Sequence, residues 1–128
     1  MTDFSNLKYY YKSEKNTQPL QINADLCIYG GTSAGVAAAV QARKMGLKVV
    51  IAEFGRRLGG VGAGGLSRTD FGNKGAIGGL SREFYREMGR FYDSKEEDGS
   101  VWYFEPSRAE QIYKEWVERY EIEVYFEQ

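Results

Sequence analysis

Short apolar runs flank an alanine-rich segment in the first half of the chain. Residues 24–29 (ADLCIY) are mostly apolar and end at a glycine pair, a pattern that predicts a strand buried on both faces. Residues 35–45 are good helix formers followed by Gly46, which predicts a helix. Residues 48–52 (KVVIA) predict a second buried strand that ends at Glu53. Strand, helix and strand together match the size of a right-handed βαβ unit, roughly 30 residues.

The second half of the chain predicts two amphipathic helices and a strand. Apolar residues recur at helical spacing from Leu80 to Phe91, the polar residues 93–100 predict an exposed turn, and Pro106 opens a further helix. Apolar and polar residues then alternate over residues 122–126, which predicts a strand. The apolar stripe of the last helix is interpreted as core and not as a cofactor site; it consists of Ala109, Ile112, Trp116 and Val117.

The order of these elements predicts an α/β fold. We expect a partial doubly wound parallel sheet, with a Rossmann-like βαβ unit, a glycine-rich loop, two further helices and a third strand. Residues 1–22 are polar and tyrosine-rich, and we expect them to form a surface extension. The strands of such a sheet would lie in the order third, second, first, so the first strand would be an open edge that invites association with a partner.

Charge and hydropathy exclude several classes of protein. Seventeen basic and eighteen acidic residues leave a net charge of −1, which argues against nucleic-acid binding. No apolar run approaches the roughly 20 residues of a membrane-spanning helix, and the amino terminus lacks the apolar core of a secretory signal. The expected location is therefore cytoplasmic, with no membrane contact.

The absence of histidine narrows the chemistry further. Without histidine the chain can build neither a Ser-His-Asp nor a Cys-His site, nor a histidine-ligated zinc site. The single cysteine cannot by itself build a metal cage, so no metal site is expected. This cysteine, Cys27, lies in the first predicted strand, where we interpret it as a small buried hydrophobic residue.

Most of the sixteen glycines lie between Gly55 and Gly79, where they are interleaved with apolar residues. A flexible linker would instead be rich in serine and other polar residues, so this stretch is interpreted as a loop packed against something. Glycine at this density also lets backbone N–H groups approach a ligand closely.

The turn after the first strand reads Gly30-Gly31-Thr32-Ser33-Ala34-Gly35, which differs from the dinucleotide fingerprint GxGxxG only by its threonine. Such a turn places unbonded helix N–H groups at the carboxyl edge of the sheet, where a pyrophosphate fits. Gly30 is expected to allow the tight turn and Gly35 the close approach of helix and strand. We hypothesise that the Thr32 hydroxyl donates a hydrogen bond to a phosphate oxygen and that Ser33 is a second donor.

An acidic residue follows at the expected distance from this turn. Glu53 ends the second strand 18 residues after Gly35, where a carboxylate can bind both ribose hydroxyls of an adenosine. The alternative is a solvated carboxylate at a strand end. A carboxylate would repel a 2′-phosphate, which favours FAD or NAD over NADP.

Residues 25–65 resemble the FAD-binding amino terminus of the FAD-dependent oxidoreductases with a glutathione-reductase-like fold. NAD-binding Rossmann domains share the first half of this segment, but Leu58-Gly59-Gly60 favours FAD, because in the flavoproteins this glycine pair meets the pyrophosphate and the start of the isoalloxazine. Residues 78–91 and 104–117 resemble one bacterial group of FAD-dependent oxidoreductases. The similarity extends from about Asp25 to the end of the sequence.

The resemblance implies FAD as cofactor and assigns binding roles to named residues. The turn Gly30–Gly35 would bind the pyrophosphate and Glu53 the ribose, with Phe54 beside it. Arg57 would pair with a phosphate or cover the adenine, unless it is a plain surface arginine. No residue receives a catalytic role, and Arg68 and Asp70 are noted as polar groups near the flavin end. The residues expected along the ribityl chain and flavin are Leu58, Gly59, Gly60, Val61 and Gly62.

Two departures from the family limit what the resemblance implies. Gly62 and Ser67 stand where the disulfide reductases carry their redox-active cysteine pair, so dithiol chemistry is rejected. Flavoproteins of this fold are several hundred residues long, so residues 23–128 are expected to be the amino-terminal part of an FAD-binding domain in a longer oxidoreductase of unknown substrate. Two alternatives stay open: an NAD-binding Rossmann module, and a non-catalytic fragment that binds no cofactor and docks through its open edge.

Overall fold

The computed structural model describes residues 19–66, 68–70 and 72–128. The predicted surface extension, residues 1–22, therefore lies mostly outside the described residues. Its last part, residues 19–22, is neither helical nor extended in a sheet and is largely exposed.

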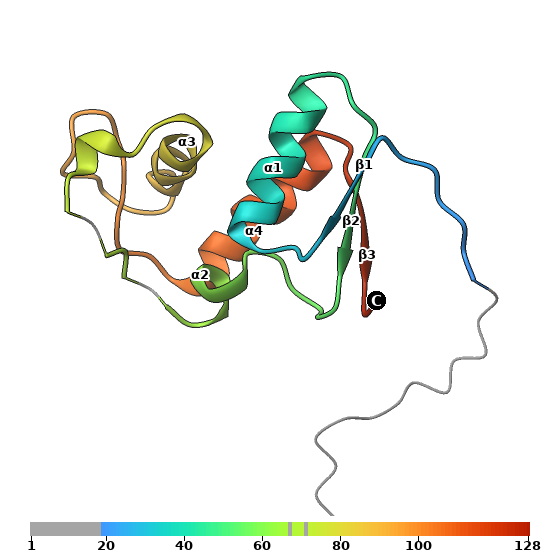
Figure 1. Ribbon diagram of the computed structural model, residues 1–128. Coiled ribbons are helices and arrows are strands. Elements are labelled where there is room, and N and C mark those ends of the chain that lie inside the picture. Colours follow the sequence, from blue (N-terminus) through green and yellow to red (C-terminus); the bar gives the residue numbers. More distant parts are fainter. Residues whose placement is uncertain (1–18, 67, 71) are drawn as a thin grey trace, which may run out of the picture.

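The chain forms a three-stranded parallel sheet with helices between its strands (Figure 1). The strand order is β1-β2-β3, which confirms the predicted α/β fold and the order of the strands. The elements are β1 Leu26–Tyr29, α1 Ser33–Lys44, β2 Val49–Glu53, α2 Gly60–Gly64, the 3₁₀ helix η1 Lys74–Ala76, α3 Gly79–Met88, α4 Pro106–Arg119 and β3 Glu123–Phe126.

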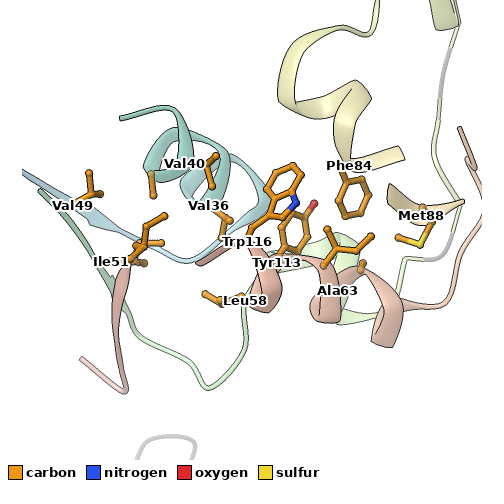
Figure 2. Packing of buried hydrophobic residues seen from close by; sticks show 14 of the residues in the cluster. Val36, Val40, Val49, Ile51, Leu58, Ala63, Phe84, Met88, Tyr113 and Trp116 are labelled. Atoms are coloured by element: carbon orange, nitrogen blue, oxygen red, sulfur yellow. The ribbon is translucent and has the colours of Figure 1, made fainter. Parts of the chain in front are cut away.

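Helices α1 and α4 cover one face of the sheet, and α3 packs on the far side of α4 (Figure 1). The two residues that join these layers are Tyr113 and Trp116 of α4. Figure 2 shows them between Val36 on the sheet side and Phe84 of α3. Trp116 is 1% exposed, and the Phe84 and Tyr113 rings stack at a centroid distance of 4.9 Å. The predicted apolar stripe of α4 is therefore core, as expected, with Tyr113 as a further member.

The opposite face of the sheet differs from the prediction. The first strand was expected to be buried on both faces, yet Cys27 is exposed and Tyr29 is 73% exposed. These two side chains alternate with Leu26 and Ile28, which pack against the core. The helices in Figure 1 lie on one side of the sheet, so among the described residues no helix covers the face that carries Cys27. The interpretation of Cys27 as a buried residue is therefore wrong.

The glycine-rich stretch holds more regular structure than the sequence predicted. It contains α2 and the short η1 within what was interpreted as a loop. Its interpretation as a packed segment is correct at α2, because Ala63 is only 2% exposed. None of the described helices is both long and apolar enough to cross a membrane.

Candidate nucleotide-binding site

The phosphate turn, residues 30–35, leads from the end of β1 into α1. Gly30 continues the ladder by donating to the Ala52 carbonyl at 2.8 Å and then adopts a φ of +108°, which favours glycine. A Cβ on Gly35 would lie 2.1 Å from the Gly30 carbonyl oxygen, so no side chain fits there. These two glycines bring the start of α1 directly against the end of β1.

Thr32, the residue that departs from the glycine fingerprint, is the N-cap of α1. Its backbone is extended and its Oγ1 accepts a hydrogen bond from the Gly35 N–H at 3.1 Å. Because the hydroxyl oxygen is the acceptor in this bond, its hydrogen stays available for donation. The side chain is exposed at the head of the helix.

The first turn of α1 presents a backbone donor beside this cap. The Ala34 N–H has no acceptor within the helix, and within the described parts of the chain no other acceptor is shown for it, whereas the Ser33 N–H faces the Gly59 carbonyl in an isolated parallel bridge between Thr32 and Gly59. The positive end of the dipole of this 12-residue helix lies at the same place. The head of α1 is therefore suited to an anion.

The Ser33 side chain, which the sequence suggested as a second phosphate donor, is engaged with the Gly-Gly segment in this structure. Its Oγ donates to the Gly59 carbonyl at 2.8 Å, and Gly59 N–H donates to the Gly31 carbonyl at 2.7 Å. These two bonds fasten the Gly-Gly segment, residues 58–60, alongside the phosphate turn. The role of Ser33 was missed because its partner lies 26 residues away in the sequence.

The Gly-Gly segment packs so closely against its neighbours that a side chain at Gly59 would not fit. Gly59 has a φ of +99°, and a Cβ on it would lie 2.6 Å from the Tyr113 ring. A Cβ on Gly31 would lie 2.5 Å from the Leu58 side chain, which is itself 1% exposed. The Leu58 side chain thus belongs to the core, whereas Gly60 and Val61 are exposed.

Glu53 lies under the phosphate turn and is only 5% exposed. One carboxylate oxygen accepts from the Gly31 N–H, and the other accepts from the Gly55 N–H at 2.6 Å. The alternative of a solvated carboxylate is therefore wrong. A carboxylate has about four acceptor positions, so two bonds leave capacity for further donors such as ribose hydroxyls.

The remaining predicted residues lie at the surface. Phe54 is 68% exposed directly after Glu53. Arg57 lies 3.5 Å from Glu110 of α4 with its side chain 73% exposed, so it forms a weak surface ion pair. Ser67 lies outside the described residues.

A cavity of about 440 Å³ opens beside the phosphate turn, between α1, α3 and α4. Ser33, Ala34 and Gly62 form the side nearest the turn, and Arg68 and Asp70 also line it. Tyr113 forms part of its wall, and burial raises the pKa of this phenol, partly opposed by its hydrogen bond with Ser33. The two polar residues noted near the expected flavin end thus line the same cavity as the head of α1.

The parallel βαβ unit and the glycine turn into the head of α1 define a domain with a Rossmann-type fold. The family model described as FAD dependent oxidoreductase matches residues 25–128. The chain belongs to this family, and the match confirms FAD as the expected cofactor and favours it over NAD.

Two solved structures show the same fold. THI4 from Thermovibrio ammonificans superposes with a TM-score of 0.56 at 20% identity, covering 80% of this chain and 38% of that one. AlpK superposes with a TM-score of 0.55 at 19% identity, covering 82% of this chain and 24% of that one. The chain therefore spans less than half the length of either structure. None of the curated proteins gives a match.

Proposed function

We propose that residues 23–128 form the amino-terminal part of an FAD-binding domain, in which the phosphate turn binds the pyrophosphate of FAD. The observation that carries this proposal is the head of α1, where the Ala34 N–H has no acceptor shown among the described residues and the Thr32 hydroxyl is exposed. Gly35 allows that head to lie against β1, so the donors stand at the carboxyl edge of the sheet.

Thr32 and Glu53 have further roles in this proposal. Thr32 caps the helix through its oxygen and donates its hydroxyl hydrogen to a phosphate oxygen. Glu53 accepts the ribose hydroxyls with the acceptor positions that Gly31 and Gly55 leave open. Because both carboxylate oxygens are already fixed by backbone donors, the ribose meets a preorganised acceptor.

The exposed residues around these two complete the proposed site. Phe54 offers a flat apolar face beside Glu53 for the adenine, while Gly60, Val61 and Gly62 lead from the pyrophosphate toward the flavin end. FAD supplies hydride or electron transfer when it is bound, and the protein supplies binding and orientation. The activity proposed for the longer protein is thus oxidoreduction of a small molecule, carried out in the cytoplasm.

Adding a negative charge at the head of α1 tests the proposed pyrophosphate site. Ala34→Asp places a carboxylate where the phosphate would lie, and an acid in the first turn of a helix does not destabilise it. We expect thermal stability to be kept and FAD affinity, measured by titration against flavin fluorescence, to fall at least about tenfold.

The matched control is Ala38→Asp, the same change one turn further along α1 at another exposed position. This variant should bind FAD as the parent does. Equal FAD affinity in the parent and in both variants would show that the head of α1 is not the pyrophosphate site.

One observation supports a second candidate function. Strand β1 pairs only with β2 among the described strands, and it carries the exposed Cys27 and Tyr29. An open edge of this kind can pair with a further strand. Stable association in size-exclusion chromatography, without any bound chromophore, would favour docking over cofactor binding as the role of this chain.

A further inference from the structure

The cavity beside the phosphate turn has mostly apolar walls. Its floor includes the first turns of α1, and its sides come from α3, α4, residue 66, residues 68–70 and residue 104. Its volume of about 440 Å³ lies within the range of small-molecule sites, roughly 300–1,000 Å³. The apolar residues of its wall are Ala37, Leu66, Leu80, Phe84, Phe104 and Trp116.

Aromatic rings dominate this wall. Phe84 stacks on Tyr113 and meets Phe104 and Trp116 edge to face, at centroid distances of 5.6 and 6.4 Å. Flat rings favour stacked or edge-to-face contact with another ring. The chemistry of the wall therefore suits a small flat aromatic ligand.

Arg68, at the same cavity, differs from the other arginines of the chain. Within residues 19–66, 68–70 and 72–128, every other arginine forms an ion pair with a carboxylate; these are Arg43, Arg56, Arg57, Arg82, Arg86, Arg90, Arg108 and Arg119. In the same residues no acidic partner is shown for Arg68, whose guanidinium lies over the Tyr103 ring at 5.3 Å. An exposed guanidinium held over a ring is suited to a ligand carboxylate.

We propose that this cavity binds a small flat aromatic monocarboxylate, with the ring against the aromatic wall and the carboxylate on Arg68. Asp70 lines the same cavity without pairing with Arg68, so it would repel a second carboxylate. The idea that this ligand is the substrate of the flavin rests on the proposed function. The binding of an aromatic carboxylate in this cavity does not depend on the proposed function.

The test compares two probes of equal shape, 2-naphthoate and the neutral 2-naphthamide, by calorimetric titration of the full chain. We expect 2-naphthoate to bind more tightly than 2-naphthamide. Arg68→Gln should weaken 2-naphthoate about tenfold or more and leave 2-naphthamide unchanged. The matched control is Arg108→Gln, an exposed arginine of α4 that does not line the cavity, and it should leave both affinities unchanged.

Three results would overturn the proposal: binding of neither probe, equal affinity for both probes in the parent, or an unchanged preference in Arg68→Gln. The titrations are repeated with FAD present, which separates the two proposals. FAD binding without 2-naphthoate binding overturns the cavity site alone, and the reverse result overturns the FAD site alone. Competition between FAD and 2-naphthoate would make the cavity part of the flavin site and so overturn a separate ligand site.

Discussion

The phosphate turn and the charged segment, residues 93–100, are held in place by different forces. The turn is fixed by backbone groups and buried contacts, and a Cβ on Gly35 would meet backbone at 2.1 Å. The charged segment is fixed by partly exposed ion pairs. Glu96 lies 2.5 Å from Lys74, and Asp98 lies 2.6 Å from Arg82.

This difference separates two ways of specifying a loop. Close packing of backbone tolerates no added atom, because neighbouring backbone cannot move aside. Exposed ion pairs tolerate substitution but respond to pH and salt. The region that is proposed to hold the cofactor is therefore also the region most sensitive to small changes of shape.

The largest expected effect is that of Gly35→Ala. Its methyl group would force the head of α1 away from β1, so we expect a loss of about 3 kcal/mol in the free energy of unfolding, measured with urea. Gly64→Ala is the control, since a Cβ at that position meets nothing within 4 Å. The control should stay within about 1 kcal/mol of the parent. Equal stability of the two variants would contradict the close packing of the turn.

Glu53→Gln is expected to have the next largest effect. The amide has only one acceptor atom, so either Gly31 N–H or Gly55 N–H would face an NH₂ group in a buried place. We expect a loss of about 1–3 kcal/mol in urea unfolding. A variant as stable as the parent would mean that these two backbone bonds do not hold the turn.

Thr32→Val keeps the shape of the side chain and removes the hydroxyl. Loss of the N-cap should cost about 1 kcal/mol, measured by urea unfolding. FAD affinity, measured separately by titration, should fall as well, whereas Thr32→Ser should retain both properties. If Thr32→Val binds FAD as tightly as the parent, the proposed bond from the hydroxyl to a phosphate oxygen does not exist.

The smallest effect, and one of a different kind, is expected in the charged segment. The Arg82 guanidinium lowers the pKa of Asp98 well below its ordinary value of 3.8. The ion pair therefore stabilises the folded chain fully above pH 3.8, and this stabilisation is lost as the pH falls further. Asp98→Asn should melt at a lower temperature at neutral pH and lose less on acidification than the parent. Parallel melting curves across that pH range would contradict the role of the pair.

The same contrast explains what the sequence could predict. The strands around α1 and the start of α4 at Pro106 follow from local pattern and were predicted closely. The cap at Thr32 could have been found too, because a threonine directly precedes an alanine-rich helix. The helix α2 could not, because glycine has a low helix propensity. Its Ala63 is buried in the core, and the adjoining Gly59 packs against Tyr113 of α4, a contact that only the folded chain brings together.

The wrong prediction for Cys27 has a different cause. An apolar run predicts a buried strand only if both faces of the sheet are covered, and the described helices cover one. The apolar pattern of residues 24–29 shows which side chains favour burial. Whether a side chain is buried depends on which elements cover its face of the sheet. Similarly, the hydrogen bond from Ser33 to Gly59 forms because folding brings together two segments that are 26 residues apart in the sequence.

The most direct measurement is a visible absorbance spectrum of the purified chain, followed by titration with added FAD and, separately, with NADH. We expect a bound flavin, or uptake of FAD with a flavin spectrum, and no comparable binding of NADH. A colourless protein that takes up no added FAD would contradict the proposed pyrophosphate site at Gly30–Gly35 in this chain.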